Sequence, residues 1–287
     1  MMPDLLAPFA YGYMVKAMWV SALVGGTCAF LSCFLMLKGW SLMGDALGHS
    51  VVPGVALAYM LKLPFSLGAF VAGGLAALAM AFVRAQTALR EDAIIGLVFT
   101  GFFASGLLLV SIYPTSVNVQ SIVLGNILAI TDWDATQVVI ISAVTLFILL
   151  LVWRDLVAVF FDEAHARSVG INPTRLKVLF FTLLAAATVA ALQTVGACLV
   201  IAMVVTPGAT AYLLTDRFPV LLAIAVAMGA ASSAIGAYLS YFIDGATGGV
   251  IVTLQTLVFL TAFLLAPKHG LLAQRRRREA ALSEARP

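Results

Sequence analysis

An aspartate and a histidine, Asp45 and His49, lie four residues apart in an apolar stretch of the chain. Residues four apart share one face of an α-helix, so the carboxylate and the imidazole would point the same way. A carboxylate in the bilayer core costs roughly 2.5–3.5 kcal/mol on insertion scales, and such residues mark ion pathways. Oxygen donors suit Mn²⁺ and Fe²⁺, and an imidazole adds affinity for Fe, Mn and Zn. The pair is therefore a candidate site for a divalent metal ion.

Spacing alone leaves two interpretations of this pair open. Two side chains form a weak, incomplete shell, which suits transport because the ion must also leave. Alternatively, Asp45 caps a helix that begins at Ala46, and His49 donates to a neighbouring carbonyl oxygen. Gly44 and Gly48 flank the pair with a spacing that permits close helix contact in membranes, but this spacing is common.

The composition shows what kind of element holds this pair. Of the 287 residues, 63% are hydrophobic and 10% are charged, and the mean hydropathy is +1.09. A soluble domain is nearer half apolar and a quarter charged, so a water-soluble globular protein, a disordered chain and a nucleic-acid-binding domain are excluded. Long unbroken apolar runs also exclude an outer-membrane barrel, whose strands alternate polar and apolar residues. We therefore expect an all-α polytopic membrane protein.

Apolar runs interrupted by charge, Pro or Gly predict about eight to nine transmembrane helices, since each span takes about 20 residues. The sixth and seventh runs are separated only by Gln193-Thr194 and could be one bent element. The N-terminus lacks the pattern of a secretory signal, so the first run is expected to stay as a span. The nine candidate spans are 13–37, 44–61, 65–83, 93–112, 136–153, 176–192, 195–213, 218–242 and 248–266.

The basic residues predict the orientation of these spans. With the N-terminus outside, only Lys16 and Lys62 of the 16 Lys and Arg residues fall on the outer side. Such a bias is what the positive-inside rule predicts for a cytoplasmic C-terminus. We expect a permease domain at 1–272 and a basic cytoplasmic tail at 273–287. The expected cytoplasmic cations are Lys38, Arg84, Arg90, Arg154, Arg167, Arg175, Lys177, Arg217, Lys268, Arg275, Arg276, Arg277, Arg278 and Arg286.

Two connections are more than simple loops. The outer segment Ser121–Ile130 is apolar but too short to span, which predicts a re-entrant or interfacial helix. The inner connection Arg154–Lys177 contains helix start and stop signals and predicts a short helix at about 161–170. Asp162 and Glu163 suit its first turn, Arg167 its last turn and Gly170 its C-terminal cap.

Five stretches of the sequence resemble motifs of the bacterial metal-type ABC permeases, which import Mn, Fe(II) and Zn. They occur in the family's order, and the match covers about residues 5–272. The details of two segments, NVQSIVLGNILAI and APKHGLLA, look most like the manganese and chelated-iron branch. The five stretches are Leu37–Leu61, Glu91–Ser111, Ser121–Ile130, Asp162–Ile171 and Val204–Pro219.

The resemblance implies a transport subunit that works by alternating access and performs no covalent chemistry. It implies that Asp45 and His49, which match the family's GDALxH motif, form part of the metal path. It also implies that the inner helix docks on an ATPase as a coupling helix. The residues matching that motif are Asp162, Glu163, Ala164, Arg167 and Gly170.

The implied partners follow from the same resemblance. They are a second permease chain, either a copy or a paralogue, two cytoplasmic ATPase subunits, and a metal-binding lipoprotein or periplasmic protein. No nucleic acid partner is expected, no cofactor is bound permanently, and the cargo is Mn²⁺ or Fe²⁺, with Zn²⁺ as an additional candidate. The sequence holds no GxxxxGK[ST] loop, so ATP hydrolysis would fall to the partner. The resemblance places the permease in the bacterial inner membrane as a multi-pass protein.

Two other functions compete with this interpretation. A permease of the vitamin B12 or siderophore class passes a large organic chelate, and its cavity should not need paired ionic ligands at a narrow point. A stand-alone secondary transporter or membrane enzyme would work without partners. The sequence shows no obvious inverted repeat with broken helices, which disfavours a secondary transporter. It also shows no HExxH and no Gly-x-Ser-x-Gly elbow, which disfavours a membrane enzyme.

Overall fold

The structure is a computed structural model, which describes residues 6–113, 127, 130–266 and 270. Within these residues the chain is helical, with no strand. The helices are α1 (Gly12–Lys38), α2 (Ser41–Ser50), α3 (Val52–Met60), α4 (Phe65–Gln86), α5 (Glu91–Ile112), α7 (Asp132–Phe161), α8 (Glu163–Ser168), α9 (Pro173–Val195), α10 (Ala197–Leu214), α11 (Phe218–Ile243) and α12 (Thr247–Leu265), preceded by the 3₁₀ turn η1 (Ala7–Ala10).

Seven of the described helices are long and apolar enough to cross a membrane: α1, α4, α5, α7, α9, α11 and α12. Helix α10 is apolar but shorter over its described side chains. Helices α2 and α3 are each too short to cross alone, because a spanning helix takes about 20 residues. Every predicted apolar run is thus helical, and the all-α polytopic fold is confirmed.

Two boundaries differ from the sequence prediction. The run 44–61 is not one helix, because the chain passes from α2 to α3 at Val51, and Pro53 stands in the first turn of α3. Proline lacks an N–H and fits a helix only in its first turn, so it favours a new start there. The run predicted at 136–153 lies within the longer helix α7, because Arg154 and Asp155 end the apolar stretch without ending the helix.

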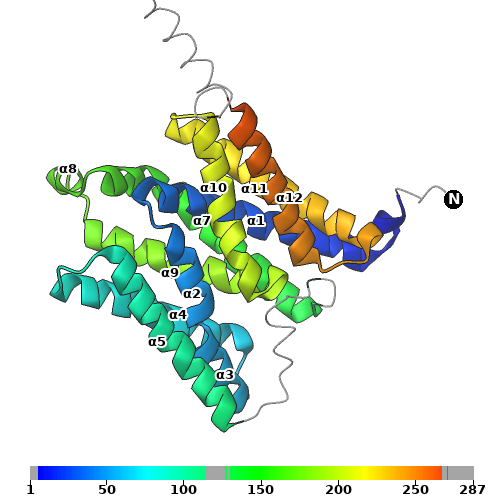
Figure 1. Cartoon of the computed structure of the whole chain (residues 1–287), viewed down its shortest axis with the longest axis horizontal. Coiled ribbons are helices and arrows are strands. Elements are labelled where there is room, and N and C mark those ends of the chain that lie inside the picture. Colours follow the sequence, from blue (N-terminus) through cyan, green and yellow to red (C-terminus); the bar gives the residue numbers. More distant parts are fainter. Residues whose placement is uncertain (1–5, 114–126, 128–129, 267–269, 271–287) are drawn as a thin grey trace, which may run out of the picture.

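The helices form two groups, and the short helix α2 lies between them. Figure 1 shows α3, α4 and α5 along one side and α10, α11 and α12 along the other. Helix α1 packs against α7, α9, α10 and α11, and α2 packs against α4, α5, α9 and α10. The short helix α2 therefore bridges the two groups from inside the bundle.

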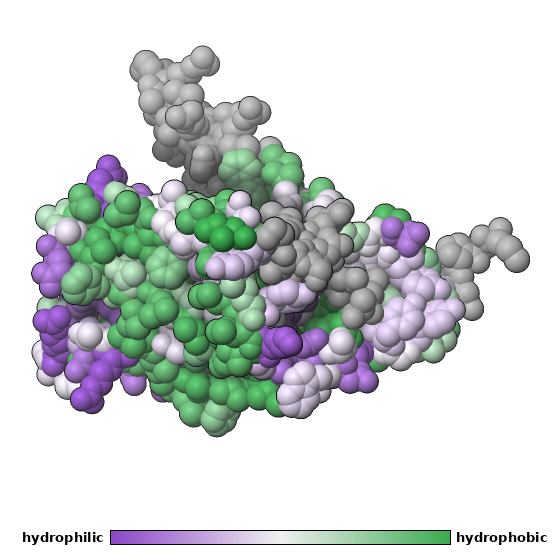
Figure 2. All heavy atoms as spheres, turned by 90° about the horizontal axis from the view of Figure 1, so that it is seen from below, coloured by the Kyte–Doolittle hydropathy of each residue, from purple (hydrophilic) through white to green (hydrophobic). Residues whose placement is uncertain are grey.

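The surface is arranged as a membrane protein requires. Figure 2 shows a broad apolar belt, with hydrophilic residues gathered at one edge and in a second group across the belt. Exposed aliphatic and aromatic side chains such as Leu97, Phe147 and Leu151 are more than 60% accessible. In water such a surface would be costly, but it suits contact with acyl chains.

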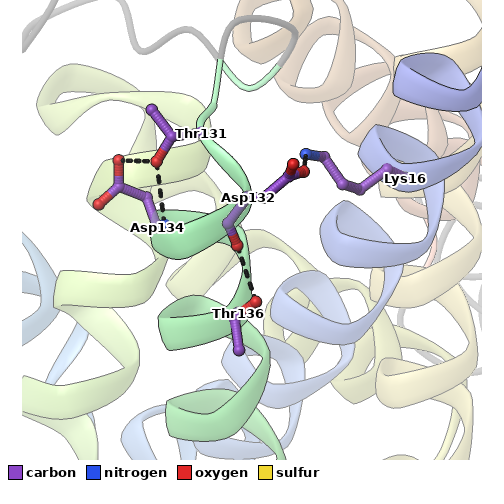
Figure 3. A network of polar contacts seen from close by, with 5 residues as sticks. All are labelled: Lys16, Thr131, Asp132, Asp134 and Thr136. Atoms are coloured by element: carbon purple, nitrogen blue, oxygen red, sulfur yellow. Dashed lines mark hydrogen bonds and ion pairs between the residues drawn. The ribbon is translucent and has the colours of Figure 1, made fainter.

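An ion pair joins two of these helices near their starts (Figure 3). Lys16 Nζ of α1 lies 2.5 Å from Asp132 Oδ1 of α7. Thr131 caps α7 by accepting from the N–H of Asp134, and its hydroxyl donates to the Asp134 carboxylate. Because the Asp132 side chain is 99% exposed, the pair stabilises the fold only weakly.

The predicted re-entrant helix Ser121–Ile130 lies outside the described residues except for Ile127 and Ile130. The basic tail 273–287 lies outside them entirely. The boundary between a domain at 1–272 and that tail therefore stays a prediction.

Candidate functional site

Helix α2 carries both candidate metal ligands, and a tight turn after α1 sets its direction. Gly39 has φ +70°, the left-handed conformation that ends α1, and the N–H of Trp40 returns to the carbonyl oxygen of Leu35 at 2.8 Å. Glycine adopts this conformation without steric cost, so the chain reverses within two residues. Helix α2 then begins at Ser41.

This boundary excludes one of the two sequence interpretations of Asp45. Helix α2 begins four residues before Asp45, and its N-cap is Trp40. Asp45 is therefore an interior helical residue and does not cap a helix that begins at Ala46. The placement of its side chain lies outside what the structure describes.

His49 lies in the last turn of α2 and faces aromatic rings of α5. Its imidazole is centred 5.6 Å from the ring of Phe99 and 5.4 Å from that of Phe103, the latter in an edge-to-face arrangement. The side chain is half-buried within the bundle. Because α2 is surrounded by four helices, the imidazole is in protein surroundings rather than on an outer face.

The other face of α2 is held close to α10. A Cβ placed on Gly44 would lie 2.9 Å from Cγ1 of Val204, so only glycine permits this approach. Gly48 is buried as well. The glycine spacing around Asp45 and His49 therefore coincides with close helix packing, as membrane helices commonly show.

The described residues contain no cluster of three or more His, Cys, Asp and Glu side chains that could hold a metal ion. The two side chains of Asp45 and His49 would by themselves form an incomplete shell. An incomplete shell is compatible with a transported ion and does not fit a tight structural site, which is closed by four ligands in the case of zinc.

The predicted inner helix is present as α8, and its ends follow the predicted signals. Asp162 is the N-cap, and its Oδ1 accepts from the N–H groups of Ala164 at 2.8 Å and His165 at 3.1 Å. These two hydrogen bonds lower the pKa of the Asp162 carboxyl, and the bond from the His165 N–H has the larger effect. Gly170 has φ +83° and ends the segment, as its predicted capping role requires.

Helix α8 is attached to α9 through an ion pair. Lys177 Nζ donates to Glu163 Oε1, and this hydrogen bond is the main cause of the lowered pKa of Glu163. Ala166 is fully buried, whereas Ala164 and Arg167 are exposed. One face of α8 is therefore exposed, while the face that carries Ala166 is held against the bundle.

Three residues near the candidate site were not identified from the sequence. Phe99 and Phe103 contact His49. Trp40, the N-cap of α2, contacts one aromatic ring of α7 and one of α9. Phe99 and Phe103 are four apart and share one face of α5, which was a visible signal. Nothing in the sequence, however, placed that face against α2.

Comparison with known proteins identifies the family. A model of the ABC 3 transport family matches residues 10–266. The chain is 72% identical over 277 residues to the chelated iron transport system membrane protein YfeC of Yersinia pestis, covering 96% of this chain and 94% of the relative. It is 49% identical over 273 residues to the manganese transport system membrane protein MntB of Synechocystis, covering 94% and 88%.

A solved structure agrees with these relatives. The structure of PsaBC from Streptococcus pneumoniae in complex with Fab matches with a TM-score of 0.85 and 32% identity, covering 96% of this chain and all of that one. The similarity extends through every described helix rather than over one motif. The chain belongs to the ABC 3 transport family, the metal-type ABC permeases whose motifs its sequence carries.

Proposed function

We propose that this permease carries Mn²⁺, Fe²⁺ or both through the inner membrane, with Asp45 and His49 as ligands on the path. The observation that carries the proposal is the position of these residues one helical turn apart on α2, inside the bundle. Relatives named for iron and manganese transport support the choice of cargo. Zn²⁺ is an additional candidate because imidazole and carboxylate also accept it.

The proposed mechanism is alternating access driven by partner proteins. Two ATPase subunits would bind at α8, and a metal-binding lipoprotein or periplasmic protein would deliver the ion to the opposite side. A second permease chain, a copy or a paralogue, would complete the membrane part. In this arrangement the N-terminus is outside and the C-terminus cytoplasmic, and ATP is hydrolysed by the partner chains.

The residues of α8 would transmit the motion of the ATPases. Asp162 fixes the start of the helix, and Gly170 fixes its end. Glu163 transfers displacement to α9 through Lys177, while the outward side chains of Ala164 and Arg167 would contact the ATPase. A rigid short helix suits this task, because a flexible loop would absorb the displacement.

Uptake of radioactive Mn²⁺ by cells tests the site. Asp45→Asn removes the charge at nearly constant volume, and His49→Ala removes the imidazole. Both should abolish most uptake. Ser50→Ala is the matched control, because among the described residues the Ser50 hydroxyl bonds to the carbonyl oxygen of Ala46 within α2. Wild-type uptake by both site variants at normal membrane abundance would refute the site.

The same assay separates the vitamin B12 and siderophore alternative. Unlabelled Mn²⁺ or Fe²⁺ should compete with the labelled ion, whereas a ferric siderophore should not. Competition by the siderophore alone would favour the chelate-transporting class.

A further inference from the structure

A cavity of about 430 Å³ lies between α8 and the first turn of α2, at the end of the bundle where α1 also finishes. Its walls come from α2, α4, α5, α8 and α9. Helix α8 lies at the far end of the molecule from the N-terminus (Figure 1). His49 of the proposed metal site does not line this cavity.

Basic residues predominate among the charged residues that line the cavity. Arg84, Arg167 and Lys177 line it, and Glu163 is the one carboxylate among the described lining residues. The charge of Lys38 also acts on Glu163 and, with Lys177 and Arg84, contributes to its lowered pKa. The described lining residues therefore include three cations and one carboxylate, an excess of positive charge.

The remaining described lining residues are mostly apolar. Trp40 is 5% exposed and stacks on Phe181 of α9 at 5.5 Å, and the guanidinium of Arg84 lies 5.5 Å from its ring. Met43 and Ile95 are also buried parts of the wall. Cations and apolar side chains in the lining of one cavity match a ligand that is anionic at one end and hydrocarbon at the other.

We propose that this cavity binds an anionic phospholipid, with the phosphate at Arg84, Arg167 and Lys177 and the start of an acyl chain against Trp40 and Met43. Arginine and lysine bind phosphate oxygens through charge-assisted hydrogen bonds. Basic pockets between helices at the cytoplasmic face are suited to acidic headgroups. An acidic protein segment would satisfy the cations but would leave the apolar interior unfilled.

The bound lipid would connect two functional elements. Arg167 belongs to α8, and Met43 lies two residues before Asp45 on α2. A lipid that contacts both would transmit displacement of α8 toward the metal helix. This consequence rests on the proposed function, but binding of the lipid does not.

Trp40 provides a reporter in the cavity wall. The full chain is placed in nanodiscs that contain phosphatidylcholine with a small fraction of brominated phosphatidylglycerol, or the same fraction of brominated phosphatidylcholine. Bromine quenches tryptophan within contact range, and subtracting the Trp40→Phe variant isolates the Trp40 signal. We expect quenching by brominated phosphatidylglycerol to be at least about twofold stronger, since the excess positive charge selects the anionic headgroup.

Two variants test the basis of this preference. Arg167→Gln should reduce it, and Arg84→Gln with Arg167→Gln should remove it. Arg175→Gln is the matched control, because Arg175 is an exposed cation at the same end that does not line the cavity. Native mass spectrometry of the same variants should show loss of retained phosphatidylglycerol in the double variant only, which checks binding independently of fluorescence.

Three outcomes would overturn the proposal. Equal quenching by the two brominated lipids would mean that no anionic lipid is selected. Relief of quenching by millimolar inorganic phosphate would identify a phosphate-ion site instead of a lipid site. Loss of the quenching when the ATPase subunits assemble, with cross-links to them from position 43 in the cavity wall, would show that a protein segment fills the cavity instead of a lipid. None of these measurements uses a metal ion, so their failure leaves the metal-path proposal untouched.

Discussion

Gly54 of α3 and Gly68 of α4 lie against each other so closely that neither position has room for a side chain. A Cβ on Gly54 would be 2.0 Å from the carbonyl oxygen of Gly68, and a Cβ on Gly68 would be 2.2 Å from that of Gly54. This reciprocal contact holds the second half of the broken α2–α3 segment against a full-length span. Small residues permit such backbone contact where lipid supplies no hydrophobic driving force between helices.

Replacing either glycine should therefore separate the two helices. Gly54→Ala and Gly68→Ala should each destabilise the protein by about 1–3 kcal/mol, the usual cost of overpacking. Gly74→Ala is the control on α4, because nothing lies within 4 Å of a Cβ there. Thermal unfolding in detergent measures the difference. Equal unfolding midpoints for Gly54→Ala and Gly74→Ala would contradict the close contact.

The sequence predicted the long helices well, because each apolar run is long enough to require a helix in lipid. It missed the break inside the run 44–61, and it placed the division between the sixth and seventh runs two residues too early. Val51 keeps helical backbone angles, and only the following proline separates α2 from α3. At the other uncertain break, α9 continues to Val195, and Gly196 with φ +87° ends it, so the division falls two residues after Gln193-Thr194. Both breaks fall at a proline or a glycine, but Pro207 stands inside α10 without ending it, so these residues alone do not reveal where a helix breaks.

The candidate site was predictable to a similar degree. Spacing placed Asp45 and His49 on one helical face, and the cap signals located α8 to within a few residues. The rings of Phe99 and Phe103 contact His49 from a helix far along the chain, and no periodicity reveals such pairing. Local patterns thus predicted the elements, while contacts between elements required the structure.

The hydroxyl of Ser32 on α1 bonds two backbone groups of α10 on either side of a proline inside that helix. It donates to the carbonyl oxygen of Val205 at 3.0 Å and accepts from the N–H of Gly208 at 2.9 Å, next to Pro207. Ser32→Ala should cost about 1–3 kcal/mol, because it leaves a buried N–H without its acceptor. The free energy of unfolding in detergent measures this loss.

Ser21→Ala on the same helix is the comparison for Ser32→Ala. The Ser21 hydroxyl is buried and has no hydrogen-bond partner among the described residues, so removing it should be neutral or slightly stabilising. If both variants lost the same stability, the loss would reflect cavity formation rather than the hydrogen bonds of Ser32.

The cap of α8 should depend on the ionisation of Asp162. Hydrogen bonds to the ionised carboxylate lower its pKa in the folded state, so the charged cap contributes above the ordinary pKa of aspartate. That contribution is lost as the pH falls through the lower, folded-state value. We therefore expect constant protection of the Ala164 and His165 amides from pH 8 to pH 5 in hydrogen exchange, after correction for intrinsic rates.

Two variants at Asp162 separate the cap from the charge. Asp162→Ala should raise exchange of these two amides several-fold, whereas Asp162→Asn retains an acceptor and should raise it less. Strong loss of protection in wild type at about pH 6 would show that the carboxylate is not held in its ionised form.

The rings beside His49 should affect metal affinity more than the maximal rate. Aromatic pairs contribute about 0.5–1.5 kcal/mol beyond burial, so Phe103→Leu should free the imidazole and raise the KM for Mn²⁺ by about 2- to 10-fold. Phe102→Leu is the matched control, since Phe102 lines a groove with α3 and α4 instead. Initial rates of Mn²⁺ uptake over a range of concentrations give both constants. If Phe103→Leu lowered the maximal rate with an unchanged KM, the ring would serve transmission of movement between α2 and α5 rather than orientation of the ligand.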